Sequence, residues 1–194
     1  MKTSILKSIF IILVLCLSVV AMADMPGNWF KAGSHPKSYK MGVEEGSKET
    51  GKKIATIKSI DKEINGFGTF MQQCLPDNYL GKRVRMSGFV KSENVTDWAG
   101  LWLRIDGAEA DKVLSFDNMG ERPIKGTTDW NKYEIVLDVP LSATMMSFGA
   151  LLKGTGQIWF DNIKFEVVDN TVEITDKSKN HMPLTEPTNL DFEK

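Results

Sequence analysis

The chain has 194 residues, 42% of them hydrophobic, and its 24 basic and 25 acidic side chains nearly balance at a net charge of −1. This balance argues against a nucleic-acid partner, because nucleic-acid binding calls for a clustered basic surface. The length is sufficient for one domain that buries its own core.

Residues 1–23 have the pattern of a secretory signal peptide. Lys2 and Lys7 precede an uncharged apolar run from residue 9 to 23, which ends in Ala21-Met22-Ala23. A basic start, an apolar stretch and small residues at positions −3 and −1 predict cleavage after Ala23. A membrane span needs about 20 apolar residues, so the shorter run predicts no stable membrane anchor. We therefore expect a secreted or periplasmic protein.

Residues 24–168 predict a single all-β domain. Short segments rich in β-branched and aromatic residues recur between Gly, Pro, Asn and Asp, with no sustained helical period. Strands are predicted at 38–43, 53–59, 68–75, 83–91, 100–106, 112–118, 131–139, 145–152 and 157–168. Strands of this number and length fit a two-sheet antiparallel β-sandwich of the jelly-roll type. Residues 169–188 are polar with two prolines and predict a linker.

The sequence offers little for catalysis. The segment "GSKETGKK" at 46–53 resembles a phosphate-binding loop, but Lys53 stands where Ser or Thr would hold magnesium, and a strand follows instead of a helix. The two histidines, His35 and His181, lie in no metal-ligand spacing. Cys74 is the single cysteine after the leader, which rules out an intrachain disulfide in the mature chain and suggests a small core residue. We expect no enzyme, although an acid–base carboxylate pair assembled by the fold stays open.

The segment "DWAGLWLRIDG" at 97–107 carries the main site hypothesis. Alternation along a strand places Ala99, Leu101, Leu103 and Ile105 on a core face. The opposite, solvent-facing side then combines aromatic and charged side chains, an arrangement suited to stacking on a sugar ring and binding its hydroxyl groups. Its predicted ligand-binding residues, with two from the neighbouring "VLSFDN", are Trp98, Trp102, Arg104, Asp106, Ser115 and Asp117. The alternative is an ordinary surface, with one tryptophan in the core and the other at a sandwich edge.

The segment "GTGQIWFDNIKFEVV" at 154–168 resembles the closing strand of the galactose-binding-like jelly rolls, which include many carbohydrate-binding modules. Trp29 and the run 159–163 fit that resemblance, which spans about residues 28–168. It implies a binding module for carbohydrate or a related polar ligand. The stretches "GKRVRMSGFVK" and "GTTDWNKYEIVLDVP" also resemble a bacterial domain found fused behind DNA-binding regulators, but no helix-turn-helix is visible in this chain.

The resemblance also implies a structural calcium where an opening-strand glutamate meets a closing-strand aspartate. The matching residues here are Glu193 and Asp161, with backbone carbonyls as further ligands. No other cofactor is expected. The opening motif is missing before Trp29, whereas "NLDFE" stands at 189–193.

The C-terminal residues 189–194 are predicted to return as a strand that fills the missing first position. Leu190 and Phe192 share one face of the pattern, as in a half-buried strand. The strand could pair within its own chain or with a neighbouring copy, giving a monomer or a strand-swapped dimer. Alternative functions are a structural or adhesion module with a protein partner, or a glycoside hydrolase-like enzyme.

Overall fold

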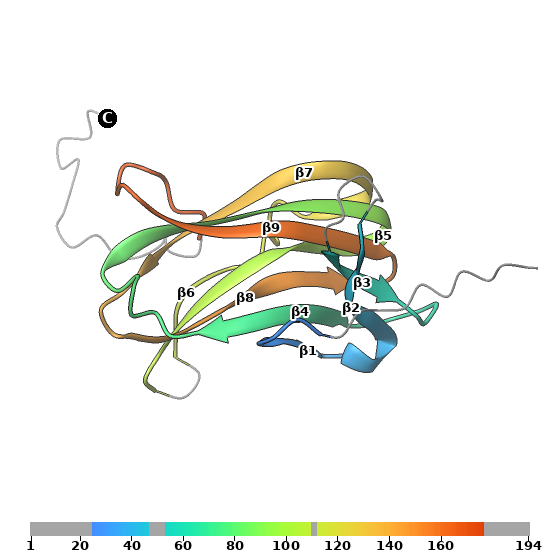
Figure 1. Cartoon of the computed structure of the whole chain (residues 1–194), viewed down its shortest axis with the longest axis horizontal. Coiled ribbons are helices and arrows are strands. Elements are labelled where there is room, and N and C mark those ends of the chain that lie inside the picture. The colour runs from blue at the N-terminus through green and yellow to red at the C-terminus, as the bar shows by residue number, and fades with distance from the viewer. Residues whose placement is uncertain (1–24, 47–52, 110–111, 177–194) are drawn as a thin grey trace, which may run out of the picture.

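The computed structural model describes residues 25–46, 53–109 and 112–176. The predicted signal peptide and the C-terminal strand 189–194 lie outside these residues. The described chain forms strands and one short 3-10 helix, η1 (Pro36–Ser38) (Figure 1). The strands are β1 (Trp29–Gly33), β2 (Tyr39–Glu45), β3 (Lys53–Ser59), β4 (Phe67–Cys74), β5 (Lys82–Gly107), β6 (Val113–Asp117), β7 (Ile124–Val139), β8 (Ala143–Lys153) and β9 (Gln157–Val168). No helix in these ranges has the length and apolarity to cross a membrane.

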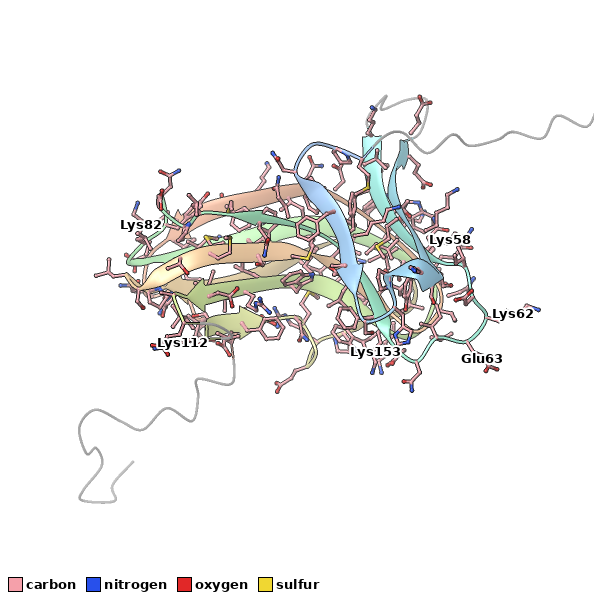
Figure 2. All side chains as sticks on the ribbon, turned by 90° about the horizontal axis from the view of Figure 1, so that it is seen from below. Lys58, Lys62, Glu63, Lys82, Lys112 and Lys153 are labelled. Carbon is pink, nitrogen blue, oxygen red and sulfur yellow. The ribbon has the colours of Figure 1, made fainter. Side chains whose placement is uncertain are left out.

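The strands form two antiparallel layers that share β5. One layer has the order β1-β4-β8-β5-β6, and the other has the order β7-β5-β9-β3-β2. Lys58 and Lys62 lie at one end of the resulting sandwich, and Lys82 and Lys112 lie at the other (Figure 2). This arrangement confirms the predicted all-β, two-sheet antiparallel sandwich.

Strand β5 spans both layers because it bends between them. The sequence predicted two strands here, at 83–91 and 100–106, but β5 is one strand of 26 residues. Its first part pairs with β7 and β9, and its last part pairs with β8 and β6. The register against β7 shifts at Ser92, Val95 and Ala99, and such bulges bend a strand and increase its twist.

The core lies between the layers, on the faces that alternation predicted. Side chains 99, 101, 103 and 105 of β5 are fully buried, as are Val84, Met86 and Val90 in its first part. Ile135 and Leu137 of β7 are also fully buried. Strand β1 was not predicted, because its sequence, WFKAG, is short and shows no apolar alternation. In the structure none of its residues is fully buried. Its Trp29 still packs its ring 5.2 Å from the ring of Phe70.

The segment after β9 is attached to the sandwich, although the sequence predicted that a linker begins at residue 169. Thr175 donates its backbone N–H to the carbonyl of Val136 at 2.9 Å. Arg83 donates to the carbonyls of Asn170 and Val172 and binds Asp138, a bond that raises the pKa of the guanidinium. Residues 169–176 are therefore part of the folded domain.

Cys74 closes β4 as a half-buried residue that packs against the main core. Its sulfur is a free thiol, and burial raises its pKa. A raised pKa keeps the thiol protonated at neutral pH, and the thiolate is the reactive form. Cys74 therefore acts as an apolar side chain here.

Candidate functional site

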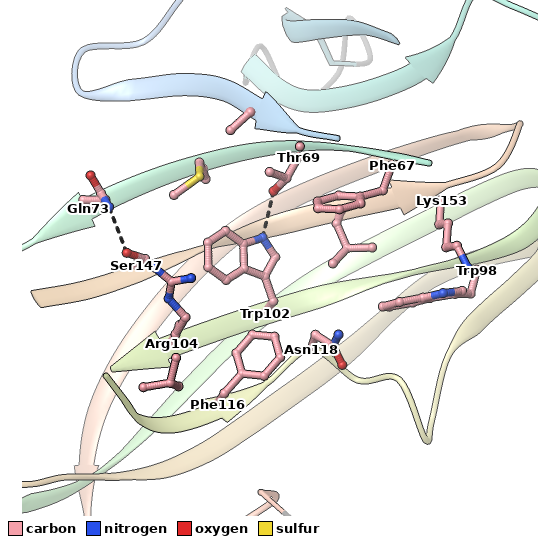
Figure 3. Close-up of a pocket in the computed structure, with 15 residues that line it drawn as sticks. Phe67, Thr69, Gln73, Trp98, Trp102, Arg104, Phe116, Asn118, Ser147 and Lys153 are labelled. Atoms are coloured by element: carbon pink, nitrogen blue, oxygen red, sulfur yellow. Dashed lines mark hydrogen bonds between the residues drawn. The ribbon is translucent and has the colours of Figure 1, made fainter. Parts of the chain in front are cut away.

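A groove runs along the outer face of the layer β1-β4-β8-β5-β6 (Figure 3). Its floor is a small apolar cluster, separate from the main core, that contains Met71, Trp102 and Leu151. The groove has a volume of about 460 Å³. It is lined by Ala32, Gly33, Phe67, Thr69, Met71, Gln73, Trp98, Trp102, Arg104, Val113, Phe116, Asn118, Ser147, Leu151 and Lys153.

Strand register brings these residues together. Side chains at paired positions of neighbouring antiparallel strands point to the same face. Across β5, β8 and β4 the pairing forms successive rows on the outer face, and Arg104 lies beside Phe116 on β6. The rows are Trp98–Lys153–Phe67, Gly100–Leu151–Thr69, Trp102–Gly149–Met71 and Arg104–Ser147–Gln73.

Trp102 forms the floor of the groove rather than an exposed platform. Its side chain lies on the outer face, as predicted, but the residue is only 8% exposed. The indole Nε1 donates to Thr69 Oγ1 at 2.8 Å, and that hydroxyl donates to the carbonyl of Ala150 at 2.7 Å. The ring is therefore held in one orientation.

Aromatic side chains with more exposure stand around this floor. Trp98 and Phe67 are half-buried, and Phe116 is 39% exposed. In Figure 3, Phe116 lies beside Trp102 on one side, and Trp98 lies near Lys153 farther along the groove. Trp98 and Phe116 thus offer the ring surface that a flat ligand could stack on.

Polar side chains stand at both ends of the groove. At one end Arg104 Nε donates to Asp106 Oδ2 at 3.0 Å, a bond that does not use the terminal guanidinium nitrogens. Gln73 Nε2 donates to Ser147 Oγ at 3.0 Å beside it. At the other end Lys153 Nζ lies 3.1 Å from the carboxylate of Asp97. Asp106 therefore orients Arg104, although it does not itself line the groove.

Ser115 and Asp117 do not lie on this face, which corrects the prediction for both. They pair with Ile105 and Leu103, so their side chains point toward the core side of the sheet. Ser115 Oγ donates to the carbonyl of Asp138 at 2.9 Å, and Asp117 is 8% exposed. Phe116 and Asn118 take their places in the groove.

The structure gives Asp117 a supporting role that can be tested. Its carboxylate accepts the backbone N–H of Met119 at 2.7 Å and forms an ion pair with Arg122 at 2.6 Å. We expect Asp117→Asn to lower the free energy of unfolding by about 1–3 kcal/mol, because a buried charged hydrogen bond is lost. Urea denaturation measures this. Ligand affinity should stay unchanged, and a selective loss of affinity at wild-type stability would contradict the assignment.

Sequence reasoning did not identify the groove residues of β4 and β8. "FGTFMQQC" does alternate, with Phe67, Thr69, Met71 and Gln73 on one side. However, Phe70 lies on the opposite face, so both faces carry large apolar side chains and the sequence does not show which of them faces the core. Only the pairing of β4 with β8, and of β8 with β5, shows that Met71 and Trp102 lie on the same face of the sheet.

The structure describes only one of the two residues that were predicted to bind calcium. Asp161 lies in β9 and lines a second groove, whereas Glu193 lies outside the described residues. Within the described ranges no group of three or more His, Cys, Asp or Glu side chains could hold a metal ion. The calcium site thus stays a prediction.

No family model matches the chain. A curated relative, the "Uncharacterized HTH-type transcriptional regulator YbfP" of Bacillus subtilis (strain 168), is 47% identical over 167 residues. The alignment covers 86% of this chain but 56% of that relative, so the chain spans little more than half of the relative's length. The name of this relative agrees with the resemblance to a domain fused behind DNA-binding regulators.

Several solved structures share the fold at low sequence identity. The enzymatically active domain of bacteriophage CBA120 tailspike protein 4 matches at a TM-score of 0.54 and 13% identity, over 73% of this chain and 20% of that one. The CBM22-1-GH10 modules of Clostridium thermocellum xylanase 10B, complexed with xylohexaose, match at 0.51 and 13%, over 72% and 26%. The tandem CBM22 domains of Paenibacillus barcinonensis Xyn10C match at 0.51 and 14%, over 73% and 46%. The chain therefore has the jelly-roll β-sandwich fold of the carbohydrate-binding modules, as the resemblance of residues 154–168 predicted.

Proposed function

We propose that the chain is a non-catalytic binding protein that recognises carbohydrate in the groove around Trp102. The observation that carries this proposal is the combination, in one outward-facing groove, of aromatic rings with polar groups at both ends. The fold shared with carbohydrate-binding modules supports it.

The physical argument rests on the two-sided character of a sugar ring. Its C–H face is apolar and stacks on an aromatic ring, while its edge carries hydroxyl groups that need hydrogen-bond partners. Trp98 and Phe116 supply ring faces, and Arg104, Gln73 and Asn118 supply polar groups at the groove wall. The rigid floor under Trp102 would hold these groups in place before the ligand arrives, which lowers the entropic cost of binding.

The groove chemistry also favours binding over hydrolysis. Most glycoside hydrolases use two carboxyl groups that flank the scissile bond. Among the described residues that line the groove there is no aspartate, glutamate, histidine or cysteine. Asp106 and Asp97 stand close by, but each is engaged in an ion pair with a cationic lining residue.

We further propose that the protein is exported and meets its ligand outside the cytoplasm. The support is the signal-peptide pattern of residues 1–23, with cleavage after Ala23. The relative named as a regulator does not contradict export, because this chain matches only 56% of its length, and the same type of domain can serve in a longer protein of different architecture. Detection of the mature N-terminus in the secreted or periplasmic fraction would test the proposal.

Trp98→Ala tests the groove directly. Binding partners would first be found by screening the chain from residue 24 onward on a glycan array that includes neutral and acidic sugars. We expect Trp98→Ala to weaken binding of the best glycan by about 1–3 kcal/mol, roughly 5- to 150-fold, by analogy with other aromatic stacking sites. Isothermal titration calorimetry would measure the change.

Trp130→Ala is the matched control, because Trp130 is 37% exposed on β7 and does not line the groove. It should bind like the unmodified protein. Equal loss of affinity in both variants, or no loss in Trp98→Ala, would contradict the proposed site.

A further inference from the structure

Strand β9 is paired with a neighbouring strand along only part of one of its two edges. Toward β5 it is paired over residues 157–161 and 164–168, with a register shift between the two stretches. On the opposite side it pairs with β3 only over 157–160, and no described strand continues that pairing along 161–168. Figure 1 shows β3 beside only one end of the long β9 ribbon. Unpaired N–H and C=O groups along such an edge favour the addition of another strand.

A second groove lies next to this open edge. Its volume is about 440 Å³, and it is lined by Asp161, Asn162 and Ile163 of β9. Core aromatic side chains, Trp29, Phe70 and Phe160, form its inner wall. A strand added to β9 here would therefore gain both backbone hydrogen bonds and an apolar surface for one of its faces.

We propose that residues 189–193 of the same chain, "NLDFE", form the strand that occupies this position. The alternating pattern matches the two requirements: Leu190 and Phe192 would face the aromatic wall, and the polar residues between them would face solvent. The groove has room for two large apolar side chains. The proposal does not depend on carbohydrate binding.

The described end of the chain lies within reach of the position. Thr175 bonds Val136 on β7, and Val136, Arg85 and Glu166 are neighbours across β7, β5 and β9. Four strand spacings separate Thr175 from the proposed strand: from Thr175 to β7, from β7 to β5, from β5 to β9, and from β9 to the added strand. At about 4.8 Å per strand this distance is on the order of 20 Å. Residues 177–188 can span roughly 40 Å when extended, which suffices to pass around the sandwich.

The short connection also favours the segment of the same chain over that of a second copy. A segment tethered by a short connection has an effective concentration in the millimolar range, well above that of a second copy in a dilute solution. Closing this loop has an entropic cost that grows only slowly with loop length. The segment of the same chain is therefore favoured over that of a neighbouring molecule.

Truncation after residue 188 tests the proposal. Compared with the chain that runs from residue 24 to 194, the truncated chain should melt about 5 °C lower or more, since it loses two buried apolar side chains. Adding a peptide of residues 186–194 should restore the melting temperature, and a scrambled peptide should not. Leu190→Asn with Phe192→Asn should reproduce the truncation, whereas Asp191→Asn should melt like the unmodified chain.

Amide hydrogen exchange of the untruncated chain provides a readout that does not require any variant to fold. Backbone amides of residues 161–168 that point away from β5 should be protected, in a monomer, at all protein concentrations. Fast exchange there, or an unchanged melting temperature after truncation, would overturn the proposal. Protection that appears only in a dimer would also overturn it, by assigning the position to a second copy.

Discussion

Trp102→Ala is expected to lower the free energy of unfolding by about 3–5 kcal/mol, because truncating a buried tryptophan removes its packing and leaves a cavity. The indole fills the space between Met71 and Leu151, and its N–H is the donor to Thr69 Oγ1. Its loss removes the floor of the groove, so ligand binding should be abolished as well. Chemical denaturation and calorimetric titration would measure the two effects.

Two further variants separate the contributions. Trp102→Phe keeps a ring on the floor but loses the hydrogen bond to Thr69, so its cost should be intermediate. Trp130→Ala removes an exposed tryptophan and should change stability by about 0.5 kcal/mol at most. If Trp102→Ala cost less than 1 kcal/mol while binding was lost, Trp102 would be an exposed stacking platform instead of a floor.

Gly149→Ala is expected to destabilise the groove layer by about 2–3 kcal/mol, because any side chain there collides with backbone atoms. A Cβ at this position would lie 2.3 Å from the carbonyl oxygen of Phe70 and 2.9 Å from the Cα of Met71. Backbone atoms of β4 cannot rotate away, so β4 and β8 would have to separate. Thr69, which holds Trp102 in place, would move with β4.

The matched control is Gly27→Ala, since a Cβ at Gly27 meets no atom within 4 Å. That variant should keep the stability of the unmodified chain. Thermal unfolding of both variants compares them, and similar melting temperatures for the two would show that β4 and β8 tolerate the extra methyl group.

Much of the fold was predictable because alternation in a strand is a local property. The predicted strand 157–168 coincides with β9, and the predicted strand 53–59 coincides with β3. The core face of β5 was also correct, since apolar residues at every second position can only point to one side of the strand. Strand β1 escaped prediction because it is short and none of its side chains is fully buried, and its position is set by pairing with β4, which is distant in the sequence.

The site was predictable in part, since each strand could be divided into two faces but not matched to its neighbours. Trp98, Trp102 and Arg104 share the groove face, as alternation in β5 required. For β6 the same reasoning chose the wrong face. A one-residue change of register exchanges the two faces of a strand, and the pairing of β6 with β5 shifts between Ile105 and Asp106.

The sequence by itself determined the class of the fold, the closing-strand motif and the face of β5 that carries the tryptophans. These features depend on residues close together in the chain. Only the tertiary structure decided that Phe116 replaces Asp117 in the groove, that the Trp102 indole is hydrogen-bonded in the floor, and that β4 and β8 supply further lining residues. These features depend on hydrogen-bond register between strands distant in sequence, which no local pattern specifies.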